Sequence, residues 1–397
     1  MKSPLEGIQV IDLSRVLTGP FATMIMGDLG AEIIKVESLG TGDVTRNWGP
    51  PYEGELSAYF MSANRNKRSI SIDLKTEHGQ EILCKLVQSA DVVIENWRPG
   101  VAERLGASYN DLKKINPKII YCSISGYGQD GPYRDLPSYD LIIQAMSGLM
   151  SITGGKESEP YKTGVAVADL FASFYALSGI LAAIRVKELK GQGQYIDISL
   201  LDSQVSVLVN IAMNYLIGNQ VAERVGNAHP NIVPYQTFNG KDGRFVVAVG
   251  NDSQFNSLCK AIGSPQLKDN PKFSTNDSRV KNRNELIDII QRIFLKKSRD
   301  YWIDTLQKYE IPCGPINNIE EAFQIPQIMH REMVVEIKDL LTSQKSKFVG
   351  SPYKFSETPI KYNYYPPKKG EHTKEVLSEI GYSKEEISNL FLKRVIE

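Results

Sequence analysis

The sequence predicts an α/β protein: a large Rossmann-like domain with a parallel sheet, followed by a smaller α+β domain. Three observations support this prediction. Strands and helices alternate over the first 200 residues, which is typical of a sheet with helices on both faces. Those strands are almost continuously apolar, as expected for strands buried on both sides. After residue 226 the pattern changes to a hairpin and charged helices, and 397 residues suffice for two or three domains.

The first half begins with a complete β-α-β unit within 37 residues. Thr18-Gly19-Pro20 reads as a turn after the first strand, and residues 39–58, rich in Gly, Pro and Thr, read as an irregular loop. The strands are expected at 8–13, 31–37, 69–74, 91–97, 118–125 and 195–200. The helices are expected at 21–29, 76–90, 101–106, 109–116, 139–150 and 170–187.

The second half reads differently. A largely apolar helix is expected at 203–217, and residues 232–238 and 245–250 form an expected antiparallel hairpin. Charged helical segments follow at 254–263, 279–295 and 299–309. The predicted organisation is a large domain (1–200), a linker (201–225), a small domain (226–325), and a return linker with a C-terminal segment packing on the large domain (326–397).

Composition excludes several classes of function. The formal net charge is zero, which argues against broad nucleic-acid binding. Four scattered cysteines without a C-x-x-C pair indicate free thiols in a reducing compartment. The N-terminal residues show no leader pattern, so we expect a cytoplasmic protein. The apolar stretch 165–186 contains Asp169 and Arg185, and therefore predicts a buried helix rather than a membrane span.

Familiar motifs are absent or misplaced. The four histidines show no metal-ligand spacing, and no P-loop or nucleophile elbow exists. Gly126 to Gly131 matches G-x-G-x-x-G, but Pro132 and Pro137 follow where a dinucleotide fold needs a helix. No bound metal and no nicotinamide cofactor are therefore expected.

Two features leave alternatives open. Asp169 comes where the N-cap of the apolar helix is expected, so it either caps that helix or is a nucleophile in an apolar pocket. A set of cations near strand ends forms either a solvated face or a site for a phosphorylated ligand. That set is Arg65, Lys67, Arg68, Lys75, Arg98 and Arg104.

Several motifs together carry a family resemblance. They include Gly27-Asp28-Leu29-Gly30-Ala31, Asn64-x-x-Lys67-Arg68-Ser69, Glu95-Asn96-x-x-Pro99-Gly100 and the segment from Gly164 to Asp169. The chain resembles the family III CoA-transferases from its first strand to Gly314-Pro315-Ile316-Asn317. That family includes formyl-CoA and carnitine CoA-transferases and the α-methylacyl-CoA racemases.

The resemblance implies that Asp169 is the catalytic nucleophile, passing through an aspartyl anhydride and an aspartyl-CoA thioester. Acyl-CoA and a carboxylic acid are then substrates, with no permanently bound cofactor. It also implies an intertwined homodimer, with no nucleic-acid or membrane partner. The CoA contacts that it implies are Val16, Leu17, Ile72, Lys75, Asn96, Trp97, Arg104 and Tyr139.

Departures from family patterns guide the choice of activity. Ser138-Tyr139-Asp140 lacks the histidine of the racemases, so one of the two bases needed for racemisation is missing. Leu17 replaces a glutamine of formyl-CoA transferases, and Gly250-Asn251 replaces their glycine-rich lid, which implies a different acyl group. Other stretches look most like the succinate–hydroxymethylglutarate CoA-transferases of this family, which points to succinyl-CoA and a dicarboxylic acid.

Arg65 is the residue that we expect to hold the second carboxylate of such an acid, because a guanidinium can grip a carboxylate through two hydrogen bonds. The alternative is that Arg65 pairs with a CoA phosphate or with a surface acid.

Overall fold

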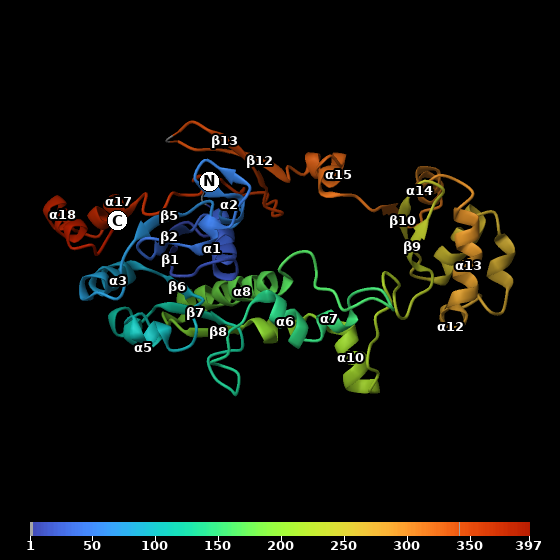
Figure 1. Cartoon of the computed structure of the whole chain (residues 1–397), viewed down its shortest axis with the longest axis horizontal. Coiled ribbons are helices and arrows are strands. Elements are labelled where there is room, and N and C mark those ends of the chain that lie inside the picture. The colour runs from blue at the N-terminus through green and yellow to red at the C-terminus, as the bar shows by residue number, and fades with distance from the viewer. Residues whose placement is uncertain (1–2, 341) are drawn as a thin grey trace. The chain divides into compact units, whose positions relative to one another are not determined.

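The computed structural model describes residues 3–340 and 342–397 (Figure 1). The chain divides into two compact units, which are described separately below. The first unit comprises Met1–Leu149, Lys162–Ile217 and Gln327–Glu397, and the second comprises Met150–Tyr161 and Gly218–Pro326. The first unit thus contains the polypeptide from both ends of the chain.

A six-stranded sheet forms the centre of the first unit, in the order β5-β2-β1-β6-β7-β8. Every neighbouring pair in it is parallel, which confirms the predicted parallel α/β sheet. Successive side chains of each strand point to opposite faces, so that Val10 and Ile11 belong to different cores. The strands are β1 (Gln9–Asp12), β2 (Glu32–Glu37), β5 (Arg68–Ser71), β6 (Val92–Glu95), β7 (Ile120–Ser125) and β8 (Tyr195–Ser199).

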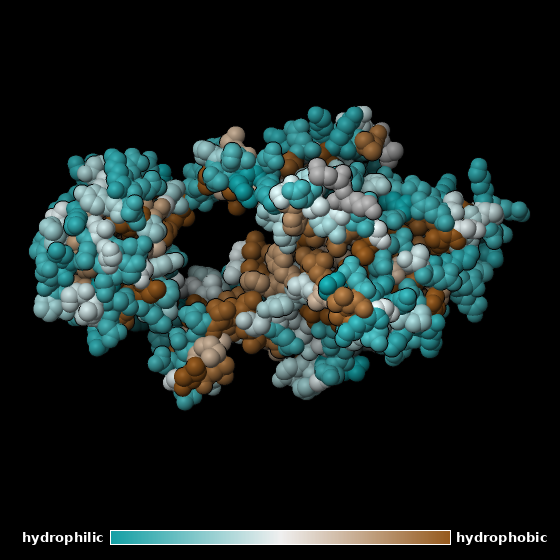
Figure 2. Space-filling model, turned by 180° about the vertical axis from the view of Figure 1, so that it is seen from behind, coloured by the Kyte–Doolittle hydropathy of each residue, from teal (hydrophilic) through white to brown (hydrophobic). Residues whose placement is uncertain are grey.

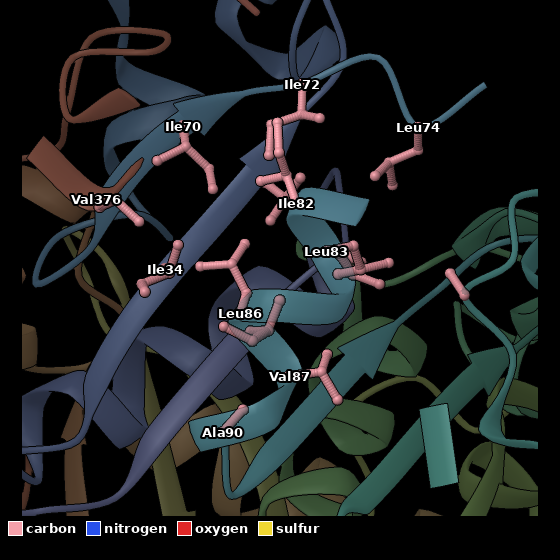
Figure 3. Packing of buried hydrophobic residues seen from close by; sticks show 14 of the residues in the cluster. Ile34, Ile70, Ile72, Leu74, Ile82, Leu83, Leu86, Val87, Ala90 and Val376 are labelled. Carbon is pink, nitrogen blue, oxygen red and sulfur yellow. The ribbon is translucent and has the colours of Figure 1, made fainter. Parts of the chain in front are cut away.

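One face of this sheet is covered by helices from the first third and the end of the chain. Ile82, Leu83, Leu86 and Val87 follow helical spacing and pack on Ile34 and Ile70 of the strands (Figure 3). Val376, more than 280 residues later in the sequence, joins the same core. The helices on this face are α3 (Glu77–Ser89), α5 (Tyr109–Ile115), α17 (Thr373–Glu379) and α18 (Lys384–Leu392).

The opposite face packs against the long helix α8 (Val167–Lys190) and its neighbours. The small residues Ala168, Ala172 and Ala176 of α8 are fully buried and allow close approach to α1. By length and composition α8 is a candidate membrane span, but this packing is that of a core helix. The other helices here are α1 (Thr18–Asp28), α6 (Asp140–Met146) and α9 (Leu200–Ser206).

Shorter elements complete the first unit. In place of the expected irregular loop at 39–58, the chain forms the 3₁₀ helix η1 (Val44–Asn47), β3 (Tyr52–Glu53) and β4 (Leu56–Ser57). A C-terminal hairpin buries Ile337 and Phe348 against Phe60. The remaining elements are α2 (Ala58–Met61), α4 (Val101–Arg104), α10 (Val209–Gly218), α16 (Pro326–His330), β12 (Val334–Lys338) and β13 (Lys345–Val349). Helix α7 (Leu149–Ile152) lies where the chain passes from the first unit to the second.

The second unit has its own core, centred on Phe238, Phe245, Phe294 and Trp302. The predicted hairpin is confirmed as β9 (Tyr235–Asn239) and β10 (Arg244–Ala248), and β11 (Cys313–Pro315) adds a third antiparallel strand. Its helices are α11 (Asp252–Ala261), η2 (Pro265–Asp269), α12 (Asn276–Lys281), α13 (Arg283–Phe294), α14 (Arg299–Lys308) and α15 (Ile319–Phe323).

Three further local predictions were wrong. Thr18-Gly19-Pro20 forms the first turn of α1 rather than a turn before it, because a proline in the first helical turn sacrifices no hydrogen bond. The apolar segment 203–217 is two helices, α9 and α10, that bend by 78°. Helix α8 begins at Val167, so Asp169 lies inside its first turn and not at the N-cap.

Candidate active site

The strand order places a crevice at the carboxyl ends of β1 and β6. The chain passes from β1 outward to β2 and β5, then returns to the other side of β1 through β6, β7 and β8. Loops after β1 and β6 therefore diverge, and ligands of parallel sheets bind at such a switch point. The two loops are tied together here, since Arg15 N donates to Asn96 Oδ1 (2.9 Å) and Asn96 Nδ2 donates to Arg15 O (2.7 Å).

A cavity of about 240 Å³ opens at this switch point, within the first unit. Its walls come from the β1–α1 loop, the segment after β6, the segment after β7 and the first turn of α8. Three guanidinium groups and one carboxylate are among the lining side chains. The residues of interest are Arg15, Val16, Thr18, Asn96, Trp97, Arg98, Arg134, Tyr139 and Asp169.

Asp169 presents its carboxylate to this cavity from the start of α8. Asp140 Oδ1 accepts a hydrogen bond from Ala168 N (2.9 Å) in that turn, so the side chain of Asp140 satisfies one of the free N–H groups at the start of the helix. The side chain of Asp169 is thereby free to face Thr18, whose Oγ1 donates to Asp169 Oδ1 at 2.7 Å.

The environment makes Asp169 an unusual carboxylate. Burial raises its pKa from 3.8 to about 6, with a further rise from the nearby charge of Asp140, while the Thr18 hydrogen bond lowers it. A helix N-terminus favours an anion, but here burial outweighs that effect. At pH 7 the group is still mostly ionised, and it is a poorly solvated and more basic carboxylate, which suits a nucleophile.

A buried charge network holds the β1–α1 loop beneath the cavity. Lys67 Nζ contacts Asp12 Oδ2 (3.0 Å), and Lys35 Nζ contacts Asp43 Oδ2 (3.0 Å). Despite burial, these two lysines hold the pKa of Asp12 at about 2, so the network is charged. Removing one partner of such a buried pair would leave an uncompensated charge, so both partners are needed to keep the loop in this arrangement.

The backbone of Val16 adopts an unusual conformation beside this charge network. Its φ is 69°, in the left-handed region that a β-branched residue rarely adopts. Its N–H lies 3.2 Å from Asp43 Oδ2, so the network supplies the acceptor that this conformation requires. Backbone strain of this kind is typical of functional sites.

A second cavity, of about 310 Å³, adjoins the first and shares Arg15, Trp97 and Arg98 with it. Ile72 and Lys75 also line it, at the end of β5. The two cavities are thus walled by common residues.

The structure brings together most of the residues predicted from sequence. Val16, Asn96, Trp97, Tyr139 and Asp169 line the first cavity, and Ile72 and Lys75 line the second. Two other predicted CoA contacts, Leu17 and Arg104, line neither of these two cavities. Leu17 is the N-cap of α1, and Arg104 is exposed on α4.

Gly250 and Asn251 lie in the second unit, where Asn251 Oδ1 caps α11 by accepting from Gln254 N (2.9 Å). Their predicted place beside the acyl group stays a prediction.

Arg65 corrects the sequence reasoning. It is only 4% exposed and lines neither cavity, because its Nε and Nη2 donate to the two oxygens of Asp28 at 3.0 and 2.6 Å. Its Nη1 donates to Val349 O (3.0 Å), which ties the C-terminal hairpin to α1. Arg65 therefore makes the bidentate interaction that was predicted for a substrate carboxylate with a carboxylate of the protein itself.

Sequence reasoning missed Thr18, the capping role of Asp140 and the support from Asp43. Thr18 and Asp169 are 151 residues apart, and nothing in a single sequence pairs them. The one available signal was the strand order, which brings every segment that follows a strand of the sheet to the same edge.

Comparisons with known proteins show which proteins the chain resembles. A family model described as CoA-transferase family III matches residues 5–373. Succinyl-CoA:glutarate CoA-transferase of Homo sapiens is 45% identical, covering 95% of this chain and 86% of that protein. Succinate–glutarate CoA-transferase of Agrobacterium fabrum is 45% identical, covering 96% of each chain. A crystal structure of a CAIB/BAIF family protein from Brucella suis superposes with a TM-score of 0.85, at 42% identity over 96% of this chain and all of that one.

Proposed function

The chain belongs to CoA-transferase family III and is a CoA-transferase, and from that premise we propose that it moves CoA from succinyl-CoA to a second dicarboxylic acid such as glutarate. The observation that carries the proposal is the partly buried carboxylate of Asp169 in a cavity at the switch point of the sheet. The names of two relatives at 45% identity supply the substrate class.

In the proposed reaction, Asp169 attacks the thioester carbonyl of succinyl-CoA. The bond between carbonyl carbon and sulfur breaks, which leaves a succinyl–aspartyl anhydride and CoA thiolate. The thiolate then attacks Cγ of Asp169 and expels succinate, which gives an aspartyl-CoA thioester. The acceptor acid attacks the carbonyl carbon of this thioester and releases the thiolate, which finally takes the acyl group from the new anhydride and regenerates Asp169.

The residues around Asp169 suit this sequence of steps. A carboxylate with a pKa near 6 is ionised at neutral pH yet reactive. Each step exchanges a carboxylate or thiolate for another, so no general base has to remove a proton. No histidine is among the described residues that line the cavity, which supports transfer over the alternative α-methylacyl-CoA racemase activity.

The cavity also offers partners for a second carboxylate. Arg15 and Arg98 line it, and within the described part of the chain their guanidinium groups make no ion pair. A dicarboxylic substrate brings one carboxylate to Asp169 and needs a cation for the other, since a desolvated anion requires a partner. This supports a dicarboxylic acid over carnitine, which carries its own cation. Leu17, in place of the glutamine of formyl-CoA transferases, supports an acid other than oxalate.

We further propose that the protein is a homodimer, intertwined as the family resemblance implies. Helix α10 buries none of its residues, and Figure 2 shows hydrophobic surface over it. Phe174 and Tyr175 of α8 and Met146 of α6 are also exposed. Exposed apolar surface on this scale is typical of an interface. Light scattering after size-exclusion chromatography tests the dimer, and a mass equal to 44.4 kDa, that of one chain, would contradict it.

The test of function is a transfer assay. Purified protein is incubated with succinyl-CoA and, in separate reactions, glutarate, hydroxymethylglutarate, oxalate, formate and carnitine, and the new CoA ester is identified by mass spectrometry. We expect glutaryl-CoA or another dicarboxyl-CoA with stoichiometric release of succinate. Product from oxalate, formate or carnitine alone, or α-proton exchange in an acyl-CoA without any acceptor, would refute the proposed substrates.

A further inference from the structure

The first turns of α1 and α8 meet at a hydrogen bond between Thr18 and Asp169. Thr18 Oγ1 lies 2.7 Å from Asp169 Oδ1, and Thr18 is 4% exposed. We propose that Thr18 is a further catalytic residue: its hydroxyl selects which oxygen of Asp169 attacks, and it stabilises the oxyanion that forms on Asp169 itself in later steps. This inference rests on the proposed aspartyl mechanism.

The direction of this hydrogen bond follows from the chemistry of the two groups. An ionised carboxylate only accepts, so the Thr18 hydroxyl must donate its proton. The main chain of the residue that carries this hydroxyl is held against α8. Ser173 Oγ, one turn along α8 from Asp169, lies 2.7 Å from Thr18 O and 2.8 Å from Asp169 O. Close packing of α1 on α8 therefore holds the donor in place before any substrate binds.

The first consequence concerns the attacking atom. A hydrogen bond withdraws charge from Oδ1, whereas no hydrogen bond to Oδ2 of Asp169 is made within the described part of the chain. Oδ2 is then the more nucleophilic oxygen and forms the anhydride bond. Oδ1 becomes the carbonyl oxygen of the acylated aspartate, still next to the Thr18 hydroxyl.

The second consequence concerns the next two steps. When CoA thiolate attacks Cγ, the S–Cγ bond forms and the electron pair of the Cγ=Oδ1 bond moves onto Oδ1. That oxyanion collapses when the Cγ–Oδ2 bond breaks and succinate leaves with Oδ2. A donor at hydrogen-bond distance from an oxyanion typically contributes 10²–10³-fold to the rate, and Thr18 is such a donor in this geometry. The oxygen that returns with the acceptor refills the Oδ2 position, so Thr18 serves both halves of the reaction.

These roles predict opposite effects on different steps. The hydrogen bond from Thr18 lowers the pKa of Asp169 and so weakens the resting carboxylate as a nucleophile. Removing the hydroxyl should therefore leave the first attack intact or faster. It should slow attack on the acylated aspartate, where the oxyanion loses its donor.

The experiment compares Thr18→Val, which keeps the shape without the donor, with Thr18→Ser, which keeps the donor. The enzyme-CoA thioester is formed with succinyl-CoA, freed of succinate by rapid gel filtration, and mixed with glutarate in a quenched-flow instrument. We expect Thr18→Val to discharge the thioester 10- to 1,000-fold more slowly than the wild type, and Thr18→Ser within threefold of it. The pH midpoint of the first half-reaction should move upward in Thr18→Val only.

Two controls keep the outcomes separable. CoA binding measured by calorimetry shows whether each variant has kept its fold. If Thr18→Val fails to bind CoA, the discharge rate of Thr18→Ser is the measurement that decides. Discharge by Thr18→Val at the wild-type rate, or by Thr18→Ser as slowly as by Thr18→Val, would overturn the role of Thr18. A loss of Thr18→Val to misfolding with Thr18→Ser slowed more than tenfold would do the same. Transfer activity retained by Asp169→Asn would instead refute the proposed aspartyl mechanism.

Discussion

Replacing Asp169 by asparagine should abolish transfer and at the same time stabilise the protein. The rise in pKa from 3.8 to about 6 means that folding places the charged carboxylate in an unfavourable environment. One pKa unit corresponds to about 1.4 kcal/mol, so the charge destabilises the folded state by about 3 kcal/mol when fully present. Asparagine is neutral at all pH values and still offers an oxygen to Thr18, so it should recover about 1–3 kcal/mol at pH 8.

The destabilisation by the charge of Asp169 depends on pH. Because the pKa of Asp169 is raised in the folded protein, the destabilisation is absent below about pH 4, grows between pH 4 and 6, and is complete above pH 6. The stabilisation by Asp169→Asn should therefore fall to about half at pH 5 relative to pH 8.

Urea unfolding at pH 8 and pH 5, monitored by tryptophan fluorescence, measures the free energy of unfolding of the variant and the wild type. Trp48 and Trp97 report on the unit that contains Asp169. Asp135→Asn is the matched control, because that side chain is 81% exposed, and it should change stability by less than about 0.5 kcal/mol. An Asp169→Asn protein less stable than the wild type at pH 8, or stabilised equally at both pH values, would show that the carboxylate is not in the strained environment described.

Three other predictions follow from the same geometry. In the wild type, kcat/KM for the half-reaction with succinyl-CoA should fall about tenfold from pH 7 to pH 5, as Asp169 is protonated below its pKa of about 6; a flat profile would contradict the assignment. Arg65→Ala should destabilise the protein by about 3–5 kcal/mol in thermal or urea unfolding, since it leaves Asp28 buried without its partner, whereas an unchanged stability with a raised KM for dicarboxylates would restore the substrate role. Lys75→Ala should weaken CoA binding more than dephospho-CoA binding, and the difference should shrink at high salt; equal losses for both ligands would mean that Lys75 does not contact the 3′-phosphate.

The sequence was sufficient to predict the parallel sheet, whereas the catalytic role of Asp169 stays a prediction. Apolar strands such as those around Ile11 and Ile94 alternate with helices at the spacing of β-α-β units. This pattern is visible in the sequence because both faces of the sheet are covered, so that each strand is apolar along its length. The family motifs then single out the carboxylate at the start of α8.

Local context misled at other positions. Asp169 resembled an N-cap, but α8 starts two residues earlier and Asp140, from α6, takes the capping interaction. Arg65 resembled a substrate ligand because the partner that neutralises it, Asp28, lies 37 residues away at the end of α1. In both cases a contact between distant segments decides the role, and one sequence does not reveal that contact.

Covalent trapping tests the central claim, that Asp169 carries the transferred group. The protein is incubated with succinyl-CoA, treated with hydroxylamine, digested and examined by mass spectrometry. We predict a hydroxamate on Asp169 in the wild type, no hydroxamate on any other carboxylate, and none in Asp169→Asn. An active wild-type enzyme that yields no hydroxamate, or a hydroxamate on a different residue, would contradict the account.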